Sequence, residues 1–186
     1  MVKKKIIFIA NSAWYLYNFR KKHIEKLVNQ NHDVYFFAPR DEFVEDLEKT
    51  GGKFFNWNLK RESQNIFTEL SALLNLLFFL TSHNHATFYT FTPKANIYTG
   101  LVSNFLNIEF YANVSGLGYT QEKGSFMNKL IINLYRFSIS NAKHIFFQNE
   151  EDLTSFLKMK LAKKIQSSVL PGSGVDIKFF RNSDIK

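Results

Sequence analysis

Short apolar runs alternate with segments of helical periodicity along almost the whole chain. The first run, Ile6-Ile7-Phe8-Ile9-Ala10, is typical of a buried strand, and Ile24, Leu27 and Val28 place apolar side chains on one side of the helix that follows. Further strands are expected over residues 32–38, 53–59, 85–91, 109–114, 143–148 and 166–170, and further helices over residues 42–50, 63–82, 93–107, 126–141 and 150–161.

This alternation predicts an α/β domain. A pair of parallel strands needs a crossover connection, which is normally a helix and is right-handed. We therefore expect a Rossmann-like parallel sheet with helices on both faces. The 186 residues are enough for one well-cored domain of this kind and too few for two of normal size.

Residues 11–20 (Asn-Ser-Ala-Trp-Tyr-Leu-Tyr-Asn-Phe-Arg) connect the first expected strand to a helix expected over residues 23–28. In an open α/β sheet, ligands bind in the crevice beyond the carboxyl ends of the strands, and a helix N-terminus offers free backbone N–H groups to an anion. Interpreted as a loop that leads to a helix start, this segment predicts a phosphate-binding site.

The common nucleotide-binding signatures are missing from the sequence. There is no G-x-G-x-x-G, and the nearest approximations, Gly116-x-Gly118 and Gly172-x-Gly174, lack the third glycine, which disfavours a nicotinamide cofactor. There is also no G-x-x-x-x-G-K-[ST] segment, so the usual loop for nucleoside triphosphate hydrolysis is not present.

Composition narrows the cellular setting more than the chemistry. The absence of cysteine excludes a disulfide scaffold and thiolate metal sites, and the apolar run after Lys5 is too short for a signal peptide, so a cytoplasmic location is expected. The net charge of +8 is compatible with anionic lipid, a polyphosphate substrate or nucleic acid. A genome that favours codons for Lys, Asn, Ile and Phe would give the same composition without functional meaning.

The helix expected over residues 63–82 is unusually apolar. Residues 70–82 carry no charge, but this stretch is shorter than the roughly 20 residues that a membrane span needs, and Ser71, Asn75 and Thr81 interrupt it. Two interpretations remain, a helix packed between the sheet and its neighbours or a helix seated at a bilayer interface.

Six sequence blocks occur in an order that is typical of a known enzyme family, and four of them follow expected strands. They are Ala13-Trp14-Tyr15-Leu16-Tyr17-Asn18-Phe19-Arg20, Ala38-Pro39 with Asp41-Glu42, Phe91-Thr92-Pro93-Lys94-Ala95-Asn96-Ile97-Tyr98, Ser115-Gly116-Leu117-Gly118-Tyr119, Phe146-Phe147-Gln148-Asn149 with Asp152, and Leu170-Pro171-Gly172-Ser173-Gly174-Val175-Asp176. Over nearly its whole length the chain resembles the N-terminal domain of family 4 retaining glycosyltransferases, which have the two-domain GT-B fold. It is most similar to bacterial enzymes of capsule, lipopolysaccharide and protein-glycan assembly that extend a sugar on undecaprenyl diphosphate.

The resemblance implies substrate-binding residues in the first block and identifies no catalytic residue. Asn18, Phe19 and Arg20, expected at the first helix start, would approach the donor diphosphate or an acceptor phosphate. The structural alternative is that Tyr15, Tyr17 and Phe19 pack the loop and that Arg20 is a solvated residue at a helix start.

Two later blocks add polar candidates for substrate binding. By resemblance, Thr92, Lys94 and Asn96 lie at another helix start, where Lys94 and Asn96 are placed for a lipid-linked diphosphate. Gln148 and Asn149 follow the sixth strand, although Asn149 could serve only as the cap of the next helix.

The glycine-bearing loop after the fifth strand is expected to approach the transferred sugar. Ser115, Gly116 and Gly118 would let the backbone come close, because a side chain would collide with the sugar there. Many family members have a donor-contacting histidine on this loop, whereas residues 113–116 of this chain read Asn-Val-Ser-Gly, which puts that contact in doubt.

No metal ion and no cofactor are expected. His83 and His85 are spaced for one face of a strand, but neither a carboxylate nor a third histidine accompanies them.

The resemblance also sets expectations for the whole protein. Residues 1–174 would form the acceptor-binding domain and residues 175–186 the start of an interdomain linker, with the C-terminal donor domain absent, so that the chain alone would not turn over. The expected partners are a nucleotide sugar, bound mainly through the missing domain, an undecaprenyl-diphosphate-linked saccharide, the inner membrane surface and a separate donor-domain chain, with no role for nucleic acid. The protein would be cytoplasmic and peripheral on the inner face of the cytoplasmic membrane. The alternative function is a non-catalytic module that binds lipid-linked sugar or docks on a membrane assembly.

Overall fold

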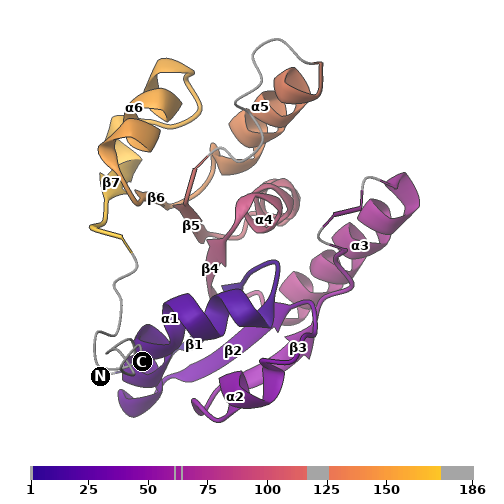
Figure 1. Ribbon diagram of the computed structural model, residues 1–186, viewed down its shortest axis with the longest axis vertical. Coiled ribbons are helices and arrows are strands. Elements are labelled where there is room, and N and C mark those ends of the chain that lie inside the picture. The colour runs from indigo at the N-terminus through magenta and orange to yellow at the C-terminus, as the bar shows by residue number, and fades with distance from the viewer. Residues whose placement is uncertain (1, 61, 64, 117–125, 173–186) are drawn as a thin grey trace, which may run out of the picture.

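The computed structural model in Figure 1 describes residues 2–60, 62–63, 65–116 and 126–172. Its seven strands form one parallel sheet in the order β3-β2-β1-β4-β5-β6-β7. The strands are β1 (Lys5–Ile9), β2 (Asp33–Ala38), β3 (Lys53–Asn56), β4 (Thr87–Phe91), β5 (Phe110–Val114), β6 (His144–Phe147) and β7 (Ser167–Val169). The helices are α1 (Ala13–Asn29), α2 (Val44–Glu48), α3 (Ile66–Ser82), α4 (Pro93–Leu106), α5 (Phe126–Ile139) and α6 (Glu150–Lys158), with the 3-10 turn η2 (Lys164–Gln166) before β7.

The strand order reverses between β1 and β4. From β1 the chain first builds outward through β2 to β3, then returns through α3 to place β4 on the other side of β1. This is the topological switch point of a doubly wound sheet, beside which ligands usually bind. The predicted Rossmann-like parallel sheet is confirmed.

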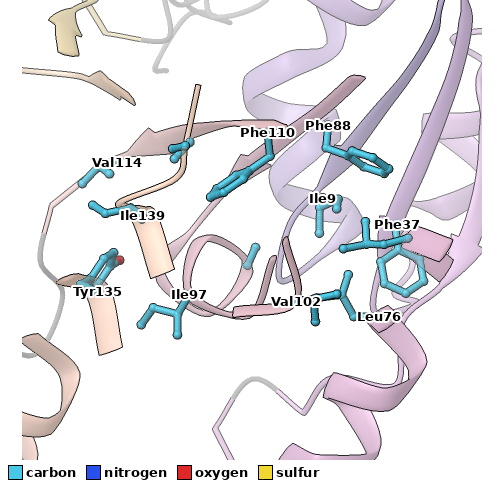
Figure 2. Packing of buried hydrophobic residues seen from close by; sticks show 14 of the residues in the cluster. Ile9, Phe37, Leu76, Phe88, Ile97, Val102, Phe110, Val114, Tyr135 and Ile139 are labelled. Carbon is cyan, nitrogen blue, oxygen red and sulfur yellow. The ribbon is translucent and has the colours of Figure 1, made fainter. Parts of the chain in front are cut away.

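Helices cover both faces of the sheet because buried strand side chains alternate between the two faces. Ile6 and Phe8 of β1 pack in one cluster with α1 and α2, whereas Ile7 and Ile9 pack in another with residues of α3, α4, α5 and α6. Figure 2 shows this second cluster, to which Ile9 of β1 and Leu76 of α3 both contribute. The prediction of helices on both faces is also confirmed.

The expectation that residues 11–20 form a loop was wrong. Helix α1 begins at Ala13, directly after its cap Ser12, whose Oγ accepts a hydrogen bond from the backbone N of Tyr15 at 3.1 Å. The backbone N of Trp14 donates to Asp41 Oδ2 at 2.9 Å. Two of the free N–H groups at this helix start are thus taken by side chains, so the start is less open to a phosphate than predicted.

Other differences concern the ends of elements. The third strand ends at Asn56 rather than residue 59, because the chain turns so that the buried indole of Trp57 can donate to the Ala72 carbonyl at 2.9 Å. Helix α3 begins at Ile66, where Asn65 Oδ1 accepts from the first free N–H groups. Among the described residues, no helix is both long and apolar enough to cross a membrane.

Candidate functional site

Two of the predicted site residues, Arg20 and Gln148, meet where β1, β4, β5 and β6 end, around the switch point of the sheet. Five side chains meet there, which we call the Arg20 cluster: Tyr15, Arg20, Phe91, Asn113 and Gln148. Tyr15 and Arg20 come from α1, while the other three lie at or just beyond the ends of β4, β5 and β6. The cluster is therefore built from segments far apart in the sequence and brought together by the parallel sheet.

Arg20 is buried at the centre of this cluster. Only 6% of the residue is exposed, its Nη2 donates to Tyr15 Oη at 3.1 Å and to Asn113 Oδ1 at 3.3 Å, and its guanidinium carbon lies 4.6 Å from the centre of the Phe91 ring. Sequence reasoning placed Arg20 at the helix start, but it lies in the second turn of α1 on the side that faces the sheet. The interpretation of Arg20 as a solvated residue does not fit this burial.

The charge of Arg20 lacks an acidic partner. No carboxylate of the described residues forms an ion pair with it, and its Nε is buried without any hydrogen-bond partner in that part of the chain. One turn later, partial burial and then the charge of Arg20 lower the pKa of His23, so this neighbour favours its neutral form. Buried charges are normally paired, and a guanidinium that is left unpaired suits an incoming anion.

Asn113, which sequence reasoning did not select, joins the parts of the cluster. Its Oδ1 accepts from Arg20 and, at 3.4 Å, from Gln148 Nε2, and its carbonyl accepts from Asn96 Nδ2 at 3.0 Å. The available signal was a polar residue close to the end of a buried strand, one position before Val114 and a glycine-bearing loop. Gln148 thus belongs to the cluster through its hydrogen bond to Asn113, whose side chain it helps to orient.

The turn between β4 and α4 is strained at Thr92. Its φ is +82° with ψ 148°, a conformation that a β-branched residue rarely adopts, and its Oγ1 is buried without a partner among the described residues. Thr92 directly follows Phe91, whose ring forms a cation–π contact with the guanidinium of Arg20. Such strain usually persists where the surrounding structure holds a functional conformation in place.

Asn96 supports the same turn from inside the protein. The residue is 1% exposed, its Oδ1 accepts a hydrogen bond from Thr90 Oγ1 at 2.6 Å, and its Nδ2 donates one to the Asn113 carbonyl. Both ends of its amide are thereby occupied, so it fixes β4 and β5 relative to α4. The structure does not bring this side chain to an open surface.

Lys94 points away from the cluster and joins α4 to α3. Its Nζ donates to Glu69 Oε1 at 2.8 Å and to the carbonyls of Ser63 and Lys60 at 2.9 and 3.1 Å. All three ammonium donors have protein acceptors, and Tyr98 Oη donates to the other carboxylate oxygen of Glu69. Burial and this hydrogen bond raise the pKa of Tyr98. In this conformation Lys94 has no donor left for a diphosphate.

Asn18 and Phe19 lie on the exposed side of α1. Asn18 Nδ2 donates to the Trp14 carbonyl at 2.9 Å, and the Phe19 ring contacts Trp14 and Tyr15 at centroid distances of 5.6 and 5.1 Å. Both Trp14 and Phe19 are exposed, and Tyr15 connects them to Arg20. This side of the cluster therefore presents aromatic rings to solvent.

The remaining candidates flank the cluster. Ser115 is exposed, and Gly116 has a φ of +97°, which favours glycine at this position; Gly118 lies outside the described residues. Asn149 is the N-cap of α6, where its Oδ1 accepts from the Asp152 backbone N at 2.7 Å. The capping role that the sequence left open for Asn149 is thus present.

A groove of about 670 Å³ lies farther along the same edge of the sheet, beyond the ends of β2 and β3. It is lined by backbone or side chains of Pro39, Arg40, Asn56, Trp57, Asn58, Leu59, Lys60, Phe67, Thr68 and Ser71. Its lining combines amide, hydroxyl and basic groups with the exposed aromatic ring of Phe67.

The groups at this edge of the sheet are suited to binding. The Arg20 cluster offers one cation, amides and aromatic rings, and no carboxylate of the described residues joins it. In the same part of the chain, no three histidine or acidic side chains are placed to hold a metal ion. The arrangement can bind an anionic ligand and orient a polar group next to it.

Comparison with known proteins identifies relatives that share this architecture. The family model described as "Glycosyl transferase 4-like" matches residues 5–149, a range that contains the whole Arg20 cluster. The N,N'-diacetylbacillosaminyl-diphospho-undecaprenol alpha-1,3-N-acetylgalactosaminyltransferase of Campylobacter jejuni is 26% identical over 181 residues, which is 95% of this chain and 48% of that protein. The chain thus spans about half the length of this curated relative.

Solved structures agree on the fold. Anabaena Alr3699/HepE in complex with UDP-glucose superposes with a TM-score of 0.65 at 17% identity, covering 96% of this chain and 46% of that one. A glycosyltransferase from Rickettsia africae gives a TM-score of 0.63 at 13% identity, covering 90% and 43%. The chain corresponds to the N-terminal half of such GT-B structures.

Proposed function

Because this chain belongs to the glycosyl transferase 4-like family, we propose that it is the acceptor-binding part of a retaining glycosyltransferase. This enzyme would move a sugar from a nucleotide sugar to an undecaprenyl-diphosphate-linked glycan in capsule, lipopolysaccharide or related cell-surface polysaccharide synthesis. Residues 1–174 are the acceptor-binding domain in this proposal, and residues 175–186 begin the linker to a donor-binding domain. The similarity to a transferase that acts on a diphospho-undecaprenol substrate supports the choice of acceptor.

The observation that carries the proposal is the buried guanidinium of Arg20 at the switch point of the sheet, which has no ion pair with any carboxylate of the described residues. A diphosphate brings the negative charge that this site lacks, and Arg binds phosphate oxygens with good geometry. Asn113 and Gln148 stand beside it as hydrogen-bonding groups, and the exposed rings of Trp14 and Phe19 offer faces against which a sugar can pack. Asn18 and Ser115 lie at the exposed margin of the same site.

The nucleotide sugar would bind mainly to the donor domain, which would approach the strained Thr92 turn and the loop that carries Gly116 and Gly118. We place the catalytic step in the cleft between the two domains and expect the 186 residues alone to be inactive. The working location is the cytoplasmic face of the inner membrane, to which the enzyme would bind peripherally. Neither a cofactor nor a nucleic acid has a role in this scheme.

A second candidate function is a module that holds lipid-linked sugar without catalysis. It is favoured by the same contacts, because every group in the Arg20 cluster can contact a ligand and neither a carboxylate nor a histidine of the described residues belongs to the cluster. The two functions differ only in what happens when a donor-binding domain is added.

The test is a titration followed by a transfer assay. A farnesyl-diphosphate-linked saccharide should bind the purified chain in calorimetry, and Arg20→Met should abolish the binding. Labelled nucleotide sugars should then give transfer only when a donor domain from a related enzyme is added as a separate chain. Transfer by the chain alone, or acceptor binding that does not depend on Arg20, would contradict the proposal, whereas binding without transfer in the presence of the donor domain would favour the binding module.

A further inference from the structure

Large apolar side chains cover the outer face of α3. Ile66, Phe67, Leu70, Leu74 and Phe78, which we call the α3 stripe, are all exposed, and four of them follow at intervals of four residues. Phe67 and Phe78 are 80% and 68% exposed. In Figure 1 the helix lies at the right margin of the molecule. An exposed patch of this kind marks a surface that contacts something other than water.

The fold itself does not need this stripe. The opposite face of α3 supplies the core, through Ala72, Leu76, Phe79 and Leu80. A surface helix normally carries charged residues on its outer side. The only charged residue of α3 is Glu69, and its carboxylate is occupied by α4.

Basic side chains lie near both ends of helix α3. At the last turn, the ammonium groups of Lys5 and Lys53 lie 5.2 and 5.3 Å from the rings of Tyr35 and Phe55, and both rings contact His83 at the end of α3. At the first turns, the groove described above joins Arg40 and Lys60 to Phe67 of the stripe. The helix that carries the apolar face thus has cations near either end, which suits a layer of hydrocarbon bounded by anionic headgroups.

We propose that the α3 stripe seats this protein on an anionic lipid bilayer. Helix α3 would lie in the plane of the headgroups, with Leu70, Leu74 and Phe78 in the boundary of the acyl chains and the four basic residues against lipid phosphates. Its 17 residues extend about 25 Å, which suits a helix lying at the interface. A second copy of the chain is a poorer occupant, because pairing two stripes would bring basic ends together in either orientation.

This seating, which rests on the proposed function for its biological meaning, would orient the groove. Phe67 belongs to both the stripe and the groove, so a bilayer under α3 places Asn56 and Asn58 at the level of the headgroups. A saccharide linked to a lipid diphosphate projects from the membrane at this level. The groove therefore becomes the place where the glycan of such a lipid would extend over the sheet edge.

Vesicle co-sedimentation tests the seating without any saccharide or polyprenyl lipid. The protein should bind vesicles of phosphatidylcholine with 30% phosphatidylglycerol, bind weakly to phosphatidylcholine alone, and dissociate as salt is raised. Leu74→Glu with Phe78→Glu should lower the partition coefficient roughly a hundredfold, because two apolar side chains lose their burial. Ile165→Glu is the matched control, since Ile165 is 94% exposed beside β7 at the opposite edge of the sheet.

The absence of cysteine allows a second, independent measurement. A single Phe78→Cys carrying an environment-sensitive fluorophore should shift to the blue on anionic vesicles and be quenched by nitroxide lipids, whereas Ile165→Cys should do neither. Circular dichroism and melting temperature would verify that each variant is folded.

Two results would overturn the seating. One is equal vesicle binding by the wild type and the Leu74→Glu, Phe78→Glu variant. The other is a wild type that does not bind vesicles and forms a dimer, together with a monomeric Leu74→Glu, Phe78→Glu variant. The stripe would then be an interface with a second copy of the chain. Since the vesicles contain no acceptor, either result would leave the glycosyltransferase proposal to its own test.

Discussion

The substitution Arg20→Met tests whether Arg20 stabilises the fold or binds a ligand. The change removes the charge and retains most of the apolar length of the side chain. It loses two hydrogen bonds, to Tyr15 and Asn113, worth about 1.5–3 kcal/mol each for a charged donor, and a cation–π contact with Phe91 of about 0.5–2 kcal/mol. Asn113 Oδ1 keeps Gln148 as a donor, whereas the hydroxyl of the half-buried Tyr15 loses its Arg20 donor.

Against these losses stands the burial of a guanidinium without a carboxylate, a penalty of several kcal/mol that methionine removes. The two effects are opposite in sign and similar in size, so the free energy of unfolding should change by less than about 3 kcal/mol. Were Arg20 half of a buried ion pair, its removal would instead cost about 3–5 kcal/mol.

Thermal unfolding with and without inorganic pyrophosphate measures both quantities in one assay. At one hundred times its dissociation constant, a ligand of the folded state stabilises by about 2.7 kcal/mol, which raises the melting temperature by roughly 5–10 °C. The wild type should show this rise and Arg20→Met should lose it. Arg136→Met, at an exposed arginine on α5, should keep it. A variant that is destabilised by 3 kcal/mol or more and still responds to pyrophosphate would refute the reasoning.

Three further substitutions test other parts of the structure. Gly100→Ala should lower the free energy of unfolding by more than about 2 kcal/mol in denaturant titrations, because the new Cβ would lie 2.2 Å from the Ser138 carbonyl oxygen. The control Gly172→Ala, whose Cβ would have no described atom within 4 Å, should cost about 1 kcal/mol for its positive φ alone. Thr92→Gly should raise the melting temperature by a few degrees through relief of strain, and an unchanged or lower value would contradict it. Burial raises the pKa of Tyr98, so Tyr98 loses its proton at lower pH in the unfolded state than in the folded state. The free energy of unfolding should therefore fall as pH rises above about 10, and Tyr98→Phe should make that fall shallower.

Much of the fold could be predicted because each element carries a local signal. The apolar run of β1 and the alternation of strands with helices specify a parallel sheet, and Gly51, with a φ of +96°, lies in the turn after the second helix, which ends at Glu48 rather than at residue 50. The start of α1 was missed because the polar and aromatic residues after Ser12 resemble a loop. The signal was present, since a serine before a long run without glycine or proline is a normal helix cap.

The candidate site was less predictable, since its geometry depends on contacts between distant segments. Nothing near Lys94 in the sequence reveals that Glu69 and two carbonyls would occupy its ammonium group. Asn113 looked like an ordinary residue of β5, and only the sheet brings it to Arg20, 93 positions earlier. The apolar character of α3 was visible, but the sequence could not tell which of its faces would be covered.

The two surfaces proposed here have complementary physical roles. The Arg20 cluster holds a positive charge in a nearly dry site, where an anion is bound strongly but few lipids could reach it. The α3 stripe is exposed and bordered by basic residues, which gives weak, reversible contact with a membrane. A lipid-linked diphosphate needs both, because its tail stays in the bilayer while its phosphates must leave water. Since the groove at the ends of β2 and β3 lies on the same sheet edge as the switch point, a lipid held at α3 would bring its diphosphate to Arg20 along one side of the domain in this proposal.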